Sequence, residues 1–349
     1  MLDYVFGLFS HEIGIDLGTA NTLVLVKGKG VVIREPSYIA RHKKTKEILA
    51  IGTEAKRMVG KTPASIVVSR PLKDGVISDF EATEAMLHYY INKVHEIPGA
   101  FPRIPRPQVV VGIPSQVTEV EARAVSEAAL SAGARQVFLI EEPMAAAIGA
   151  GLPVEEPEGS MIVDVGGGTS EIAVISLSGI VVNKSLRIAG DEMDQAIIDY
   201  CRKTEAILLG AKTAEDVKIT VGTAYPLKKE IETVVRGRSL KTGLPKSIRV
   251  TSKQTLEALR PVVSQIVEAI SDTLQDTPPE LVGDILEKGI VLAGGGSLLR
   301  GLDRLVAERT KMPVWVVDDP LTCVVRGCGK VLEDRTLLEK VKVIGGIRG

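Results

Sequence analysis

The sequence predicts an α/β fold that occurs twice in the chain, in two domains of the same architecture. A short hairpin with a glycine-rich turn appears in each half, as Asp16-Leu-Gly-Thr-Ala-Asn-Thr22 and as Asp164-Val-Gly-Gly-Gly-Thr-Ser170. Apolar residues flank both turns, and a third apolar strand follows at nearly the same offset, from Gly30 and from Gly179. Recurrence of one arrangement in two copies of roughly 150 residues is typical of two domains with one fold.

Two further pairs of elements extend the repeat. In each pair, an apolar strand is followed by a helical pattern. The first pair is 109–115 with 119–132 and 289–297 with 298–309, and the second is 137–143 with 144–149 and 314–320 with 321–326. Each half therefore reads βββ-α-β-α. A length of 349 residues also favours two domains.

Two polar inserts interrupt this pattern, and we expect each to form a small subdomain that walls the cleft between the main domains. Within the first, residues 55–62 nearly match a phosphate-binding P-loop but lack its first glycine, so we interpret them as a helix end. The second contains helical patterns at 192–209 and 213–219. The expected boundaries are 1–36, 70–147 and 318–349 for the first main domain, 37–69 for its small subdomain, 148–183 and 250–317 for the second main domain, and 184–249 for its small subdomain.

The composition excludes several classes of protein. A net charge of −1 argues against a nucleic-acid partner. The three cysteines form no CxxC pair, which argues against structural zinc and fits a reducing cytoplasm. The four histidines lie outside every motif, so nothing supports a histidine-activated nucleophile. We expect no signal peptide, and the longest uncharged apolar stretch, 143–154, is too short to span a bilayer.

The two glycine-rich turns are suited to a polyphosphate. Successive backbone N–H groups in such turns bind anions, and glycines let the main chain approach closely. Two turns that face each other would grip one polyphosphate from both sides, which implies a nucleotide in the interdomain cleft. The expected ligand groups are Gly18, Thr19, Ala20 and Asn21 on one side and Gly166, Gly167, Gly168 and Thr169 on the other.

Each turn also has an aspartate, Asp16 or Asp164, where its first strand ends. Neither turn contains a lysine, so most of the positive charge that neutralises the phosphates has to come from a metal ion. Magnesium takes one or two carboxylates and keeps several waters, and both aspartates suit that role. The alternative is that each carboxylate caps its own turn through Asx hydrogen bonds.

At these two turns the chain resembles the superfamily of actin, the sugar kinases and the seventy-kilodalton heat-shock chaperones. Three further stretches, 70–80, 141–151 and 289–302, resemble the bacterial actins of cell-shape determination. The resemblance covers nearly the whole chain, and the proline-rich loop 96–107 is its one local departure. It implies a duplicated actin-like (ribonuclease H-like) fold, two βββαβα domains each with a small inserted subdomain, and ATP with Mg²⁺ in the interdomain cleft.

The resemblance also implies an activity and a location. Members of this family hydrolyse ATP slowly and polymerise through a head-to-tail interface, which does not close and so yields a filament. The expected filament lies in the cytoplasm, peripherally on the inner face of the cell membrane. There it would act with membrane proteins of the cell-elongation machinery and organise the wall synthesis that maintains rod shape.

Hydrolysis needs a group that orients or deprotonates the attacking water, and Glu142 is the candidate. It stands between a strand and a helix start at Pro143, and it matches the residue that positions water in this superfamily. Thr169 would hold the same water or the γ-phosphate, and Asp164 would hold the metal. The alternative for Glu142 is a carboxylate that favours a helix N-terminus.

Further nucleotide contacts are expected in the second half. The strand-to-helix junction Gly294, Gly295, Gly296 and Ser297 would let the adenosine lie against the main chain. Glu215 and Lys218, by resemblance, contact the ribose and adenine. The alternative for that pair is a surface ion pair at i,i+3, worth about 0.2–0.5 kcal/mol.

Two segments have the character of membrane contacts. Residues 1–9 carry apolar side chains at amphipathic helical spacing, namely Leu2, Val5, Phe6 and Phe9. The loop 96–107 carries Ile97, Phe101 and Ile104, flanked by Arg103 and Arg106. A single copy should bind a membrane weakly, and a filament with many copies tightly. The alternatives are that the terminus packs on its own domain and that the loop is a plain proline-rich turn.

Three other functions remain to be weighed. A small-molecule kinase of the superfamily would need a substrate-binding insertion larger than 184–249. A chaperone ATPase would need a substrate-binding domain after residue 349. A non-polymerising, non-hydrolysing adaptor is disfavoured because Glu142 and Thr169 are both present.

Overall fold

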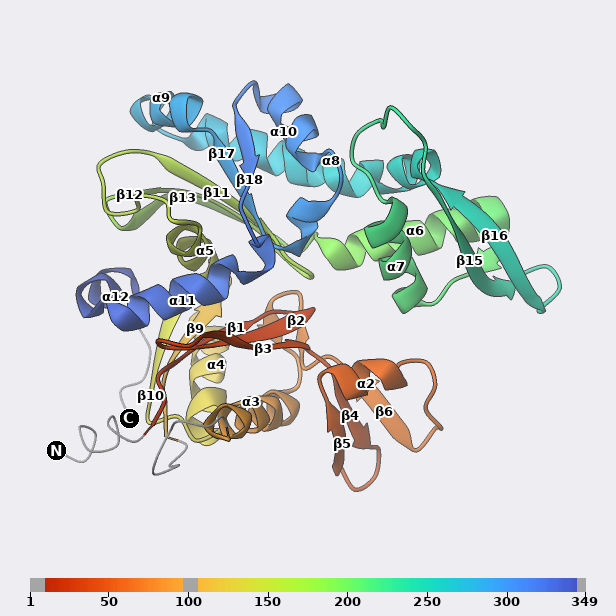
Figure 1. Cartoon of the computed structure of the whole chain (residues 1–349), viewed down its shortest axis with the longest axis horizontal. Helices are drawn as coiled ribbons and strands as arrows, with labels where there is room; N and C mark the ends of the chain where they lie inside the picture. Colours follow the sequence, from red (N-terminus) through yellow and green to blue (C-terminus); the bar gives the residue numbers. More distant parts are fainter. Residues whose placement is uncertain (1–9, 97–105, 344–349) are drawn as a thin grey trace.

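The chain folds around two five-stranded sheets of the same topology (Figure 1). The computed structural model describes residues 10–96 and 106–343. When the strands of each half are numbered along the chain, both sheets have the order 5-4-1-2-3. In both, the first three strands are antiparallel neighbours and the last two run parallel to the first. The predicted duplication is therefore confirmed.

The first half supplies the strands and helices at the bottom of Figure 1. Its elements are β1 (Ile13–Leu17), β2 (Asn21–Val26), β3 (Gly30–Pro36), the short hairpin β7 (Leu72–Lys73) and β8 (Val76–Ile77), α3 (Phe80–His95), β9 (Gln108–Ile113), α4 (Glu119–Ser131), β10 (Gln136–Glu141) and α5 (Glu142–Ala150). Helix α3 starts where the Asp79 side chain accepts from the N–H of Ala82, and a reciprocal Thr118–Glu121 capping box starts α4.

The second half of the chain repeats the order of strands with additional helices. Its elements are β11 (Ser160–Val165), β12 (Ser170–Ser176), β13 (Gly179–Leu186), α8 (Ser252–Asp276), α9 (Pro279–Lys288), β17 (Ile290–Ala293), the 3₁₀ turn η1 (Gly295–Leu298), α10 (Leu302–Thr310), β18 (Val314–Val316), η2 (Pro320–Thr322), α11 (Cys323–Glu333) and α12 (Arg335–Val341). Its last segment returns to the first main domain, where α11 packs against β1, β2 and β9.

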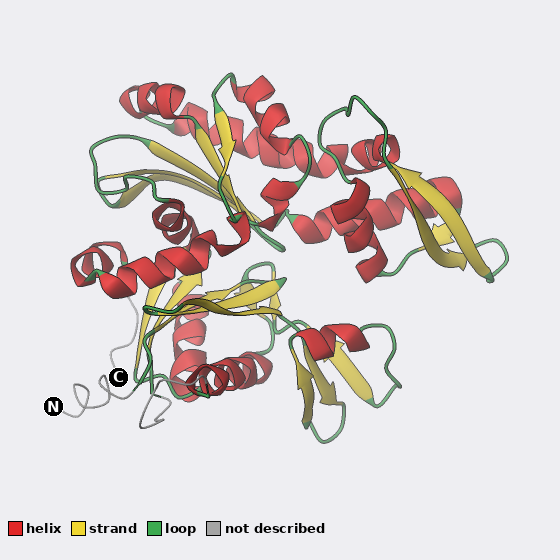
Figure 2. Ribbon diagram, viewed as in Figure 1, coloured by secondary structure: helices red, strands yellow, loops and turns green. Residues whose placement is uncertain are grey.

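The two inserts form small sheets with helices, and Figure 2 shows them beyond the two main sheets on the same side of the molecule. The first contains β4 (Ile39–His42), β5 (Ile48–Ile51), α2 (Thr53–Met58) and β6 (Ile66–Ser69). The second contains α6 (Gly190–Glu205), β14 (Ile207–Leu208), α7 (Ala211–Val221), β15 (Glu232–Ser239) and β16 (Pro245–Thr251). The expected boundary between 183 and 184 falls inside β13, which belongs to the main sheet.

Several elements differ from the sequence pattern. Helix α3 precedes the fourth strand of the first half, and α8 and α9 precede that of the second, so helices are present that the sequence pattern did not indicate. The helix expected from 298 begins at Leu302, because Gly301 at φ 74° interrupts the chain before it. The helix expected to reach 209 ends at Glu205, since Ala206 adopts a left-handed φ of 49°.

Strand alternation decides which side chains face the region between the halves. In β1, Ile13, Ile15 and Leu17 pack into the core under α3 and α4. Asp16 therefore lies on the opposite face. In β11, Met161, Val163 and Val165 pack into the core of the second half. Asp164 again takes the opposite face, so one geometric rule turns both aspartates toward the cleft.

Helices α5 and α11 pack against each other between the two sheets (Figure 2). Their close approach depends on glycines. A Cβ at Gly149 would overlap the carbonyl group of Cys323, and one at Gly327 would overlap that of Ala145. Because the chain crosses between the halves at these helices, their packing holds the halves in register.

Candidate active site

The two glycine-rich turns face each other at close range. A Cβ placed on Gly167 would lie 2.5 Å from the Cβ of Ala20, and one on Gly168 would lie 2.8 Å from the Oγ1 of Thr19. The second turn is closed by a hydrogen bond from the N–H of Gly166 to the carbonyl of Thr169, at 2.8 Å. The two turns are therefore in contact with each other where the two halves meet, and their binding of a nucleotide stays a prediction.

Asp16 and Asp164 lie near the ends of the strands that lead into these turns. Burial raises the pKa of Asp16 to about 7. Burial, with the nearby charges of Asp16 and Glu171, raises the pKa of Asp164 to about 8. The charge of Asp16 thus opposes ionisation of Asp164. A cation between them would relieve this repulsion.

Glu142 adds a third acidic group. It is the first residue of α5, immediately after β10 ends at Glu141. Burial raises its pKa well above the ordinary glutamate value, and the charges of Glu171, Asp16 and Asp164 raise it further. Glu142 therefore lies close enough to both aspartates for their charges to raise its pKa.

Sequence reasoning missed Glu171. This residue of β12 is 1% exposed. Its carboxylate accepts hydrogen bonds from the hydroxyl and N–H of Ser115 (2.6 and 3.2 Å) and from the hydroxyl of Ser185 (2.6 Å). Ser115 belongs to the first half, so Glu171 joins the halves below the turns. The signal was available: an acidic residue interrupts an otherwise apolar or small-residue strand, and buried carboxylates need donors.

The donor set fits a magnesium ion that also binds phosphate. Among the described residues, no group of three or more histidine, cysteine or acidic side chains forms a metal cage. Mg²⁺ commonly takes one or two carboxylates and completes its shell with water and substrate phosphates. Asp164 supplies a buried carboxylate of that kind and Asp16 a partly buried one, and their raised pKa values mark the charge that a cation would neutralise.

The junction 294–297 packs against the end of β11. A Cβ on Gly294 would overlap the carboxylate of Asp164 and the carbonyl of Val165, and one on Gly296 would overlap the Val165 side chain. The hydroxyl of Ser297 donates to the carbonyl of Gly294 at 2.7 Å. Two of these glycines are therefore required by the protein's own packing. Their contact with an adenosine stays a prediction.

Glu215 and Lys218 do not pair with each other, so the i,i+3 surface ion pair is not formed. The ammonium of Lys218 lies 2.8 Å from the carboxylate of Asp194 and donates to the carbonyl of Gly190 at 2.8 Å. Burial raises the pKa of Asp194 to about 6, and Lys218 limits that rise. Lys218 thereby reaches the residue that follows Ala189 at the start of α6, close to the second turn.

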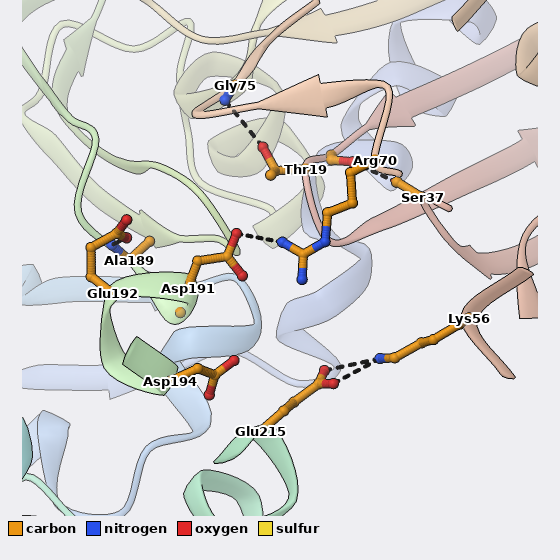
Figure 3. Close-up of polar contacts among 12 residues, drawn as sticks. Thr19, Ser37, Lys56, Arg70, Gly75, Ala189, Asp191, Glu192, Asp194 and Glu215 are labelled. Atoms are coloured by element: carbon orange, nitrogen blue, oxygen red, sulfur yellow. Dashed lines mark hydrogen bonds and ion pairs between the residues drawn. The ribbon is translucent and has the colours of Figure 1, made fainter. Parts of the chain in front are cut away.

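Glu215 instead pairs across the cleft with Lys56 of α2, at 2.9 Å (Figure 3). A second ion pair, between Arg70 and Asp191, also crosses from the first half to the second. Both pairs border a cavity of about 200 Å³ between the small subdomains. Sequence reasoning did not identify Lys56, Arg70 or Asp191, because each finds its partner more than a hundred positions away.

The segments expected to contact a membrane, 1–9 and most of the loop 96–107, lie outside the described residues. This applies to Leu2, Val5, Phe6, Phe9, Ile97, Phe101, Arg103 and Ile104. No helix within the described ranges is long and apolar enough to cross a bilayer.

Comparison with known proteins gives concordant matches over nearly the whole chain. The family model described as "MreB/Mbl protein" matches residues 10–340. The cell shape-determining protein MreB of Escherichia coli (strain K12) is 53% identical over 337 residues, which cover 95% of this chain and 96% of that protein. The cell shape-determining protein Mbl of Bacillus subtilis (strain 168) is 48% identical over 336 residues, covering 96% of this chain and 100% of that protein.

Solved structures agree with this result. MreB5 of Spiroplasma citri bound to ADP is 37% identical and superposes with a TM-score of 0.88, covering 96% of this chain and 99% of that one. The same protein bound to AMPPNP gives a TM-score of 0.87 at 37% identity, over 95% of this chain and 98% of that one. The actin-like fold of this chain is therefore established.

Proposed function

This chain belongs to the MreB/Mbl family, and from that premise we propose that it is an ATP-hydrolysing, filament-forming protein that helps to determine rod cell shape. The observation that carries the proposal is that the two glycine-rich turns face each other across the two halves, each with an aspartate whose pKa is raised at the end of its first strand. That arrangement suits a nucleotide polyphosphate with its magnesium ion.

The residues of the cleft would divide the work as follows. The turn residues 18–21 and 167–169 would donate backbone N–H groups to the phosphates, and Asp16 and Asp164 would hold the metal. The N–H of Gly166 already donates to the carbonyl of Thr169, so Gly166 would contribute through its lack of a side chain. The metal would neutralise charge on the phosphates. A cation nearby would also make the carboxylate of Glu142 easier to ionise. The ionised Glu142 would orient the attacking water. Glu215, Lys218 and 294–297 border the ribose and base. The nucleotides in the MreB5 structures, ADP and AMPPNP, support adenine as that base.

Replacement of Glu142 by glutamine tests hydrolysis. This change keeps the shape of the side chain and removes its ability to accept a proton. We expect phosphate release from Mg²⁺-ATP to fall by about 100-fold or more, with nucleotide affinity nearly unchanged. The matched control is Glu141→Gln, the adjacent carboxyl at the end of β10, which should keep its activity. Unchanged phosphate release in Glu142→Gln would remove Glu142 from the mechanism.

Opposite charges at the two ends of the second half support head-to-tail assembly. Figure 1 places β15 and β16 at one end of that half and α9 at the other. The first end presents exposed basic side chains, namely Arg236, Arg238, Lys241 and Arg249. The second presents exposed acidic ones, namely Glu156, Glu280 and Glu287, whereas the exposed Glu155 and Glu158 are paired with Lys340 and Lys288. Charge complementarity of this kind favours a neighbour in the same orientation and speeds association.

Charge reversal tests that interface. The double change Arg236→Glu/Arg238→Glu should raise the critical concentration for assembly, measured by pelleting with Mg²⁺-ATP. The double change to lysine, which preserves the charge, should leave it nearly unaltered. Adding a Glu280→Lys/Glu287→Lys partner should restore co-assembly. Equal pelleting of the reversed and parent proteins would place the interface elsewhere.

We propose that the filament attaches to the inner face of the cell membrane through residues 1–9, with the loop 96–107 as a second contact. The support is the amphipathic spacing of 1–9 and the apolar, arginine-flanked loop. Deletion of 1–9 should weaken pelleting with liposomes while pelleting of filaments without lipid persists. If liposome pelleting is unaffected, residues 1–9 do not carry the contact, and changes in the loop become the next test.

A further inference from the structure

We propose that Arg70 is a positioning residue, which holds the two phosphate-binding turns at their working separation through its ion pair with Asp191. The proposal rests on the proposed function, because it concerns the same cleft. It assigns a role to a cation that neither turn contains and that lies outside the nucleotide-binding residues predicted from the sequence.

The ion pair crosses the cleft from one half to the other. Arg70 follows β6 in the first half, and Asp191 is the second residue of α6 in the second. The Nη1 of Arg70 donates to the Oδ2 of Asp191 at 2.5 Å, and the two side chains are 26% and 31% exposed (Figure 3). The guanidinium also lies 5.1 Å from the ring centre of Tyr38. The pair is thus largely shielded from water, where charge pairs interact more strongly.

Asp191 is joined directly to the second turn. Its backbone N–H donates to the carbonyl of Gly167 at 2.8 Å, and the N–H of Gly190 donates to the carbonyl of Gly166 at 3.2 Å. The start of α6 therefore moves with this turn. Any force that Arg70 exerts on the carboxylate of Asp191 is transmitted to the turn through a backbone that is already hydrogen-bonded to it.

Arg70 is joined to the first turn by the segment that follows it. Residues 70–75 lead into the hairpin of β7 and β8, whose base is held by hydrogen bonds from Ser78 and Asp79 to the carbonyl of Pro71. The N–H of Gly75 donates to the Oγ1 of Thr19 at 3.1 Å (Figure 3). A Cβ on Gly75 would also lie 2.9 Å from the Cγ2 of Thr169.

These contacts form a closed ring of structure around the phosphate site. The ring runs from the first turn through the hairpin to Arg70, across the ion pair to Asp191, and back to the second turn. Burial disfavours the charged guanidinium, but the carboxylate of Asp191 more than compensates, so the pKa of Arg70 is raised. The ion pair is the link by which this ring passes from one half to the other. Breaking it therefore opens the ring.

Lys56 and Glu215 provide a matched comparison. They also pair across the cleft, at 2.9 Å, and their exposed fractions are 27% and 29%. Their cation stands on α2 in the small subdomain, however, and not on the segment that contacts Thr19. Loss of this pair should therefore leave the separation of the turns unaltered.

The test is a double-mutant cycle on Arg70→Gln and Asp191→Asn, with the charge-swapped protein Arg70→Asp/Asp191→Arg and the control Lys56→Gln. Two quantities are measured on the full chain: kcat for phosphate release from Mg²⁺-ATP, and the dissociation rate of a fluorescent ADP analogue. A displacement of the turns by about 1 Å costs up to 100-fold in rate. We expect each single variant to lower kcat by about tenfold or more and to speed dissociation by a similar factor.

The pattern among variants separates positioning from general stability. The double variant should be no worse than either single one, because both remove the same link. The swapped protein should recover part of the loss. Lys56→Gln removes the partner of Glu215, a proposed ribose contact, so it serves as a control for kcat alone, which should match that of the parent. Thermal unfolding of each variant identifies any protein that fails to fold. If one single variant does not fold, the other single variant and the swapped protein still test whether Arg70 positions the turns.

Several outcomes would overturn the proposal. These are parental kcat and dissociation rates in Arg70→Gln and Asp191→Asn, additive losses in the double variant, or an equal loss of kcat in Lys56→Gln. Failure of the proposed function looks different: the parent itself would release no phosphate from ATP. The dissociation rate of the ADP analogue would then still report whether Arg70 and Asp191 hold the cleft.

Discussion

Replacement of Gly167 by alanine measures how closely the two turns must approach. A Cβ at this position would lie 2.5 Å from the Cβ of Ala20, whereas carbon atoms in contact rest about 3.5–4.0 Å apart. The turns would therefore have to separate by roughly 1 Å. Gly167 does not have a left-handed φ, so its backbone tolerates alanine and the effect arises from this contact. Since a displacement of that size costs about 100-fold in rate, we expect kcat for ATP hydrolysis to fall to that extent.

A second substitution isolates the cause. Changing Ala20 to glycine in the Gly167→Ala protein removes the opposing methyl group and leaves the backbone of residue 20, whose N and Cα lie 3.2 and 3.4 Å from the new Cβ. The double variant should therefore regain a large part of the lost rate. Gly210→Ala is the control, because nothing lies within 4 Å of a Cβ there and its φ is −82°.

The assay is steady-state phosphate release with Mg²⁺-ATP, alongside binding of a fluorescent nucleotide and a thermal melt. Gly167→Ala should keep its melting temperature near that of the parent and lose rate. Hydrolysis at the parental rate would refute the apposition of the turns at this distance. A double variant as slow as Gly167→Ala would show that methyl contact is not the reason for the loss.

Two further predictions concern stability. Without divalent cations, Asp16 and Asp164 keep their protons in the folded protein up to about pH 7 and about pH 8, whereas in the unfolded chain the aspartate pKa is 3.8. Unfolding between these values therefore releases protons. The free energy of unfolding should consequently fall as pH rises from about 4 to 8. Urea midpoints in EDTA would show this, and a midpoint that rises over pH 5–8 would contradict it, as would an equal slope in an Asp16→Asn/Asp164→Asn protein. Gly149→Ala should lower the free energy of unfolding by about 1–3 kcal/mol or more, because its methyl would overlap the carbonyl of Cys323; Gly283→Ala, with open space around it, is the control, and equal urea midpoints for the two would disprove the reasoning.

The elements that the sequence predicted correctly are those with local signals. Both hairpins combine apolar alternation with a glycine-rich turn, and a single matched pattern identified the duplication. The helix expected at 119–132 is confirmed as α4, which runs from Glu119 to Ser131, and a Thr118–Glu121 capping box at its start is a local signal of the same kind. Residues 55–62 were correctly excluded as a P-loop, since α2 occupies 53–58. In each case the information lies within a few residues along the chain.

The elements that the sequence reasoning missed have weaker local signals or depend on distant contacts. Helices α3 and α8 lie beside the inserts, where the repeat between the halves is interrupted, so pattern matching did not extend to them. The glycines of 294–297 illustrate a different limit. A glycine run indicates that something approaches closely, but only the structure shows that Asp164 and Val165 are what approach Gly294 and Gly296.

The sequence by itself determined the duplicated architecture, the two facing turns and the two aspartates, because strand alternation and turn chemistry act over neighbouring residues. Only the tertiary structure decided that Glu171 joins the halves below the turns, that Lys218 pairs with Asp194 rather than Glu215, and that Arg70 reaches Asp191 across the cleft. These contacts join residues from different elements or different halves. Their partners are chosen by the packing of whole domains, which no local pattern encodes.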